Sequence, residues 1–199
     1  MPKQLNKMEP LPLRDVKVGG GFWKKRIDTN RKRTIPHEQK LCRDTGRMDA
    51  FRAVWDRKVK IEPHHFWDSD LAKWIEAVGY SLSTDPDPKL ERELDELVGW
   101  ISKAQQRDGY LNTHYTIVEP KKRWSNLQDM HELYCAGHLM EGAVAYYEAT
   151  GKRELIDVLS RYADYIDTVF GPKKGQKRGY PGHEEIELAL VKLYRATGR

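Results

Sequence analysis

The chain has 199 residues and a mass of 23.3 kDa, the length of a single domain or of one part of a larger protein. Hydrophobic residues make up 39% of it, which is enough for a core and excludes a disordered chain. No apolar run approaches the roughly 18 residues of a membrane span, and the mean hydropathy is −0.79, so no membrane partner is expected. The net charge of +5 is spread over short basic runs without the pattern of a nucleic-acid-binding module, so no nucleic acid is expected either.

The N-terminus and the cysteines indicate a reducing, cytoplasmic compartment. Met1 to Asn6 is followed by no apolar segment, so the sequence predicts no signal peptide. Cys42 and Cys135 are too few and too far apart for a disulfide framework or a self-contained zinc site. We expect both to be ordinary buried thiols.

The apolar side chains recur with the period of an α-helix in five segments. These segments are residues 70–82, 90–101, 139–147, 155–169 and 186–194. The first two are separated by the turn sequence Asp85-Pro86-Asp87-Pro88, and an Ala-Thr-Gly stop at Gly151 returns 47 residues later at Gly198. The pattern predicts an all-α chain of repeated helical hairpins, with strands absent or marginal.

The third hairpin has only its first helix, so we expect the chain to be part of a longer α/α array. The apolar stripe of that helix, formed by Ile186, Leu190, Leu193 and Tyr194, should then lack a covering partner. In a stack of hairpins alternate helices run parallel, so the helix starts near residues 69, 128 and 183 should share one end.

The helix starts predict a polar and aromatic rim at that shared end. Four aromatic residues are expected there, Trp67, Tyr110, Trp124 and Tyr180, beside His, Asn, Gln and Asp side chains. Flat aromatic rings beside amide and imidazole groups suit the faces and hydroxyls of a sugar. Carbohydrate is therefore the favoured ligand class.

Two carboxylate pairs permit either acid/base chemistry or a structural role. Asp68 and Asp70 precede an apolar stripe, where a helix N-terminus favours acidic residues through capping and the helix dipole. Glu184 and Glu185 stand in the same position before the last helix. The structural interpretation is favoured for both pairs.

His131, Cys135 and His138 fall at i, i+4 and i+7, on one face of a helix, and could offer three ligands to a metal. One helix supplies all three only with strain, and no fourth ligand is evident. Core packing of Cys135 is favoured over metal binding, and no metal ligand is assigned in this segment.

Read together, the motifs resemble the amino-terminal part of glycoside hydrolase family 127, the β-L-arabinofuranosidase family. The motifs are Gly20-Gly-Phe-Trp23, Thr45-Gly-Arg47, Asp68-Ser-Asp-Leu-Ala-Lys-Trp-Ile-Glu-Ala77, Asp108-Gly-Tyr-Leu-Asn-Thr113, Arg123-Trp124, His131-Glu-Leu-Tyr-Cys-Ala-Gly-His-Leu139, Ala145-Tyr-Tyr-Glu-Ala-Thr-Gly-Lys152 and Gly179-Tyr-Pro-Gly-His-Glu-Glu-Ile-Glu-Leu-Ala189. Residues 1–12 are assigned to an N-terminal tail and residues 13–199 to the first portion of the catalytic domain.

The resemblance implies an (α/α)6 toroid, incomplete in this chain. It also implies a retaining hydrolase that removes terminal β-L-arabinofuranose from oligosaccharides, with a zinc-bound cysteine thiolate as nucleophile and a glutamic acid as general acid. The family places nucleophile, acid and zinc ligands beyond the end of this chain, so no catalytic residue is assigned here and the segment alone is expected to be inactive.

The residues that the resemblance does carry over are substrate contacts. It implies that His131 and His183 hydrogen-bond the furanose, and Asp68 and Asp70 are added as further substrate-binding candidates. The alternative is a non-enzymatic α-solenoid that binds protein partners, which the hairpin repeat also permits.

Overall fold

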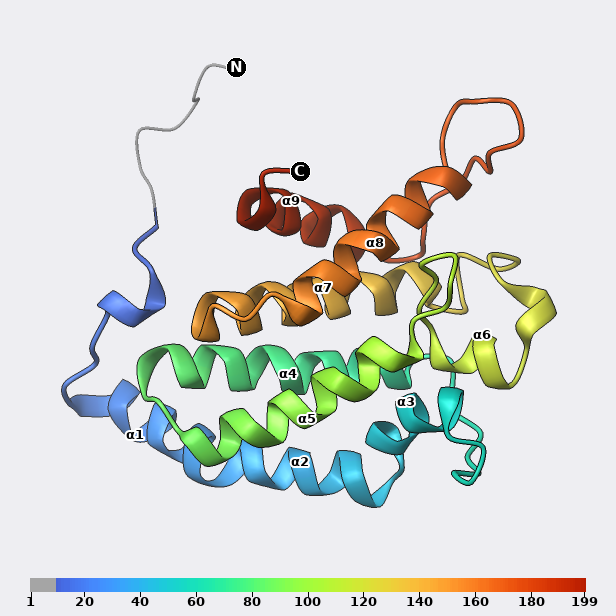
Figure 1. The fold of residues 1–199 in the computed structure, drawn as a ribbon. Coiled ribbons are helices and arrows are strands. Elements are labelled where there is room, and N and C mark those ends of the chain that lie inside the picture. The colour runs from blue at the N-terminus through green and yellow to red at the C-terminus, as the bar shows by residue number, and fades with distance from the viewer. Residues whose placement is uncertain (1–9) are drawn as a thin grey trace, which may run out of the picture.

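The computed structural model describes residues 10–199, and this part of the chain is helical (Figure 1). The α-helices are α1 (Gly21–Thr29), α2 (Ile35–Asp44), α3 (Arg47–Trp55), α4 (Trp67–Thr84), α5 (Pro88–Ala104), α6 (Thr113–Ile117), α7 (Glu132–Thr150), α8 (Glu154–Val169) and α9 (Glu185–Thr197). Between residues 10 and 199 the only β-type pairing is an isolated bridge from Phe170 to Lys177, which confirms the all-α prediction. None of the helices in this range is long and apolar enough to cross a bilayer.

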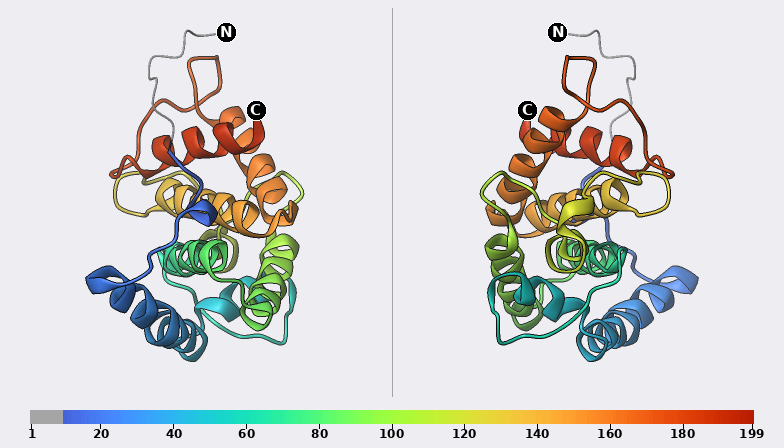
Figure 2. Two further views of the ribbon diagram at one scale, coloured as in Figure 1. Left: turned by 90° about the vertical axis from the view of Figure 1, so that its left-hand side faces the viewer. Right: turned by 90° about the vertical axis from the view of Figure 1, so that its right-hand side faces the viewer.

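The helices stack in two layers. α4 packs along α7 and α7 along α9 in one layer, while α5 packs against α8 in the other (Figures 1 and 2). Aromatic contacts join the residues just before α4, α7 and α9, so these three helices begin at the same end of the stack. The predicted parallel course of alternate helices is confirmed.

Local capping signals explain several helix boundaries. The Asp87 side chain accepts hydrogen bonds from the backbone N–H groups of Lys89 and Leu90, and Pro88 occupies the first turn of α5. Gly151 and Gly198 end α7 and α9 in the left-handed conformation, with φ of 73° and 76°, as the repeated Ala-Thr-Gly stop predicts.

The capping interpretation of Asp68 and Asp70 is wrong. Phe66 precedes the first residue of α4, and no side chain caps this helix end. Both aspartates lie in the first turn, where the helix dipole favours them, but their carboxylates bind partners elsewhere in the fold. No side chain caps α9 either, although Glu184 stands at its cap position.

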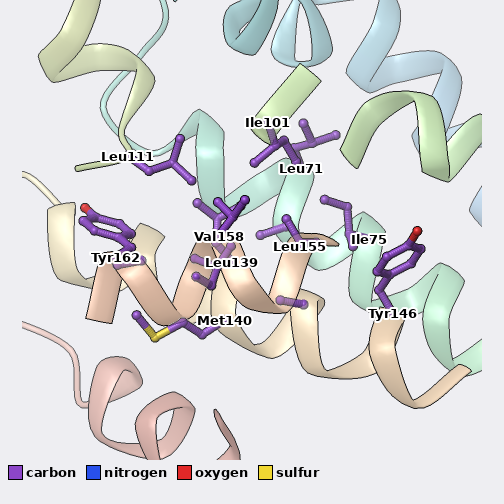
Figure 3. Packing of buried hydrophobic residues seen from close by; sticks show 14 of the residues in the cluster. Leu71, Ile75, Ile101, Leu111, Leu139, Met140, Tyr146, Leu155, Val158 and Tyr162 are labelled. Atoms are coloured by element: carbon purple, nitrogen blue, oxygen red, sulfur yellow. The ribbon is translucent and has the colours of Figure 1, made fainter. Parts of the chain in front are cut away.

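The core lies between the two layers. Figure 3 shows side chains from α4, α5, α7 and α8 meeting there, among them Leu71, Ile101, Leu139 and Leu155. Within the α4–α7 layer the helices pack closely at Gly79. A Cβ atom on Gly79 would lie 2.7 Å from the carbonyl carbon of Ala145, so the close approach depends on the absence of a side chain.

Two of the four residues of the predicted α9 stripe are exposed. Leu190 and Tyr194 are 38% and 59% exposed, whereas Ile186 and Leu193 are each 5% exposed and turn towards the core because α9 packs on α7. Leu188 and Val191, which lie outside the predicted stripe, are 51% and 58% exposed. The prediction is therefore confirmed for Leu190 and Tyr194 and wrong for Ile186 and Leu193.

Candidate functional site

Three imidazoles lie in a row at the common end of α4, α7 and α9. His65 precedes α4, His131 immediately precedes α7, and His183 lies two residues before α9. The ring centroids of His65 and His131 are 5.3 Å apart, and those of His131 and His183 are 5.2 Å apart. We call these three residues the histidine row. The predicted rim thus exists, and it brings the two histidines of the sequence analysis together.

A hydrogen bond to a backbone carbonyl determines which ring nitrogen of His131 carries the proton. His131 adopts a left-handed conformation with φ of 59°, and its Nδ1 lies 2.6 Å from the carbonyl oxygen of Asp129. A carbonyl oxygen only accepts hydrogen bonds, so Nδ1 carries the proton and Nε2 of the neutral ring is an acceptor. His131 can therefore accept a hydrogen bond from a ligand hydroxyl.

Tyr134 lies beside the histidine row and was missed by the sequence analysis. Its ring centroid is 5.4 Å from that of His131 and 5.0 Å from that of His183. Lys73 Nζ donates a hydrogen bond to Tyr134 Oη over 2.7 Å, which leaves the phenol proton free for another acceptor. The signal that could have found Tyr134 is its position one helical turn after His131.

His65 was also missed, although it lies only two residues before the start of α4. Burial, together with the nearby His64 and His131 rings, lowers the pKa of His65 to about 4. At neutral pH His65 is therefore uncharged and can donate from one ring nitrogen and accept at the other. The row suits a neutral, hydroxyl-rich ligand.

Asp68 and Asp70 have protein partners. Asp68 is buried and accepts from the Thr113 backbone N–H at 2.8 Å and from Thr113 Oγ1 at 2.5 Å, which ties the start of α6 to α4. Burial raises the pKa of Asp68 to about 6 despite these bonds. Asp70 accepts from Arg47 Nε at 2.8 Å and lines a cavity of about 480 Å³ between α2 and α4 together with Cys42 and Lys73.

The predicted aromatic rim is wrong at two of its four positions. Tyr110 is fully buried and Trp124 is 5% exposed, and their rings pack edge to face with centroids 5.5 Å apart. Trp67 is partly exposed beneath the Arg47 guanidinium, and Tyr180 is 84% exposed. Two of the rings that were expected to face a sugar therefore support the loops behind the site.

A second polar cluster joins α7 to α9. His138 Nδ1 lies 3.2 Å from Glu185 Oε1 and 3.5 Å from Glu141 Oε2, and Lys192 pairs with Glu141. Burial and the adjacent Glu141 carboxylate raise the pKa of Glu185 to about 8, so Glu185 is protonated at neutral pH. Burial lowers the pKa of His138 to about 4.

The residues present do not fit a zinc-bound thiolate. Among residues 10–199, the ligand atoms of His138, Glu141 and Glu185 are the group close enough to share a metal ion, and this group contains no cysteine. Cys135 is 1% exposed and its thiol donates to the backbone carbonyl of His65, while burial raises the pKa of the Cys42 thiol. We derive no catalytic step through a metal on these residues.

Comparison with known proteins gives one consistent family. Residues 15–199 match the family model described as "Beta-L-arabinofuranosidase, GH127 catalytic domain". A non-reducing end β-L-arabinofuranosidase of Bifidobacterium longum subsp. longum is 38% identical over 208 aligned positions, which cover 92% of this chain and 32% of the relative.

Two solved structures have the same fold. The GH127 β-L-arabinofuranosidase from Geobacillus stearothermophilus T6 is 50% identical with a TM-score of 0.89, and a second GH127 β-arabinofuranosidase is 41% identical with a TM-score of 0.87. The matches cover 92% and 95% of this chain but 30% and 31% of those chains, so the chain spans about a third of the length of its relatives. On this match and on the shared helical fold, the chain belongs to glycoside hydrolase family 127.

Proposed function

We propose that this chain forms one wall of the sugar pocket of a retaining β-L-arabinofuranosidase, whose substrate is an arabinose-containing oligosaccharide. In this proposal residues 13–199 are the first portion of an (α/α)6 catalytic domain. The observation that carries it is the histidine row, which three separate helix starts bring to one end of the fold. Family membership supports a glycoside hydrolase and disfavours the non-enzymatic scaffold.

His131 and His183 hold the furanose by its hydroxyl groups in this proposal. His131 Nε2 accepts a hydroxyl proton because Nδ1 is engaged by the Asp129 carbonyl. His183 is exposed, so its ring is accessible to a ligand.

The reacting groups lie outside residues 1–199 in this proposal. Neither cysteine is an accessible thiol close to the histidine row, and Asp68 and Asp70 are occupied by Thr113 and Arg47. The zinc, the thiolate and the general acid would then come from the remaining two thirds of the longer protein. In this proposal the buried Asp68 shapes the site through Thr113, and Asp70, whose side chain is 32% exposed, remains a candidate contact for the sugar.

The test is His183→Ala in a full-length family enzyme that carries this chain. Loss of a hydrogen bond to a neutral partner in a desolvated pocket typically costs about 1–3 kcal/mol. We therefore expect kcat/KM on an aryl β-L-arabinofuranoside to fall by roughly tenfold or more, with metal content and Tm nearly unchanged. Lys174→Ala, which removes an exposed side chain from the same loop and lies outside the predicted rim, is the matched control. A variant that melts earlier but turns over normally once folded would make His183 a structural residue.

A further inference from the structure

The segment that presents His131 begins and ends in strained backbone. Trp124 and His131 have φ of 58° and 59°, and they are the only non-glycine residues with positive φ between residues 10 and 199. The left-handed conformation is unfavourable for a residue with a side chain, so it persists only where the surroundings impose it. Something must therefore hold both ends of residues 124–131.

One buried carboxylate connects those two ends. Glu132 directly follows His131 and is completely buried at the first position of α7. Its Oε2 accepts the Trp124 backbone N–H at 2.5 Å, and its Oε1 accepts the Tyr110 hydroxyl at 2.6 Å. The Glu132 side chain thereby closes the loop from Trp124 to His131 and attaches it to Tyr110.

Arg123 and Trp124 pack against Tyr110 and so support the hydrogen bonds of Glu132. The Arg123 guanidinium lies over the Tyr110 ring at 3.8 Å from its centroid, and the Trp124 ring packs edge to face on the same tyrosine. Arg123 additionally donates to Gln106 Oε1 at 2.5 Å. Burying a carboxylate costs free energy unless its oxygens accept hydrogen bonds, and the Glu132 oxygens accept one each from Trp124 and Tyr110.

The loop that Glu132 closes also contacts the segment that presents His183. Gly182 N–H donates to the Leu127 carbonyl over 3.4 Å, and a Cβ atom on Gly182 would overlap the carbonyl of Gln128. The segment before His183 thus lies directly against residues 127–128. A shift of residues 124–131 would move both imidazoles.

We infer that Glu132 is a positioning residue, which holds the strained 124–131 loop so that the His131 ring stays beside the His183 ring at the wall of the sugar pocket. That the positioned histidines bind sugar rests on the proposed function. The effect of Glu132 on the positions of His131 and His183 can be tested without sugar. Glu132 touches neither the ligand nor the reacting atoms, so its effect reaches the site only through His131.

Three substitutions of Glu132 distinguish the contribution of the length of its side chain from that of its negative charge. Glu132→Gln keeps the length of the side chain, so its Oε1 can still accept from Trp124 while its amide donates to Tyr110 Oη. Glu132→Asp keeps the charge but is one methylene too short to reach both donors. Glu132→Leu fills the volume with no acceptor. All three are expected to lower Tm, because each disturbs a buried hydrogen-bonded pair.

The readout is the contact between the two imidazoles, measured on the sugar-free chain labelled at its histidines. The ring centroids lie 5.2 Å apart, so a nuclear Overhauser effect between carbon-bound ring protons of His131 and His183 is expected in the wild type. We expect Glu132→Gln to keep this effect and Glu132→Asp and Glu132→Leu to lose it. Glu184→Gln, at an exposed carboxylate beside His183, is the control that should change nothing.

Two results would overturn the inference: retention of the contact in Glu132→Asp and Glu132→Leu despite a lower Tm, or its loss in Glu132→Gln. The proposed function has a separate test: it fails if His131→Gln in the full-length enzyme leaves kcat/KM unchanged, whatever the imidazole contact does in the Glu132 variants. If Glu132→Leu does not fold, Glu132→Asp and Glu132→Gln decide the question between them.

Discussion

Replacing Gly79 by alanine tests the close packing of α4 against α7. A Cβ atom there would lie 2.7 Å from the Ala145 carbonyl carbon and 2.9 Å from the Ala145 oxygen and Cβ, so the obstacle is mainly backbone and cannot rotate away. Gly→Ala in a helix interior stabilises by about 0.5–1 kcal/mol, and overpacking costs about 1–3 kcal/mol. Because helix backbone must move, we expect the clash to prevail by about 1–2 kcal/mol.

Gly99 is the matched control, since it lies inside α5 and a Cβ atom there meets nothing within 4 Å. Gly99→Ala should raise the free energy of unfolding by about 0.5–1 kcal/mol through helix propensity alone. For a domain of this size about 1 kcal/mol shifts Tm by about 2–4 °C, so thermal melts followed by circular dichroism should move in opposite directions. If Gly79→Ala stabilises as much as Gly99→Ala, the described α4–α7 contact is wrong.

Three further predictions concern pH, surface and activity. From pH 6.5 to 8 the free energy of unfolding should fall as pH rises, because burial raises the folded-state pKa of Glu132 to about 7 and of Glu185 to about 8 from an ordinary 4.5. The folded state loses the protons of these groups between pH 6.5 and 8, whereas the unfolded state has already lost them. Glu185→Gln should therefore make the free energy of unfolding, measured by denaturant titration, depend less steeply on pH. An unchanged dependence would contradict the assignment. The exposed apolar face of α9 should bind a hydrophobic dye and promote self-association, and Val191→Glu should reduce both, measured by fluorescence and light scattering; a dye-silent monomer would refute this. The 199-residue chain should show no hydrolysis of an aryl β-L-arabinofuranoside, and activity that copurified with it would return catalysis to residues within this chain.

Local patterns in the sequence determined the helical class and several boundaries. The 3.6-residue period predicts the helices of both layers from Asp70 onward, and Asp87, Pro88, Gly151 and Gly198 mark helix ends through contacts within a few residues. The same reasoning says little about α1 to α3, whose helices carry few buried residues and no clear stripe. The resemblance supplied the family, which the comparisons confirm.

Tertiary structure decided what the polar and aromatic residues do. Asp68 sits in a helix start, yet its partner is Thr113, 45 residues away, and no local rule predicts that pairing. Tyr110 and Trp124 resemble exposed loop aromatics in the sequence but are buried around Glu132. The histidine row required three helix starts to meet: the sequence predicted their common end, and packing of α4, α7 and α9 brought His65 beside the two expected histidines. Periodicity and caps act over one or two helical turns, whereas a site is assembled by contacts between segments that only the packed fold brings together.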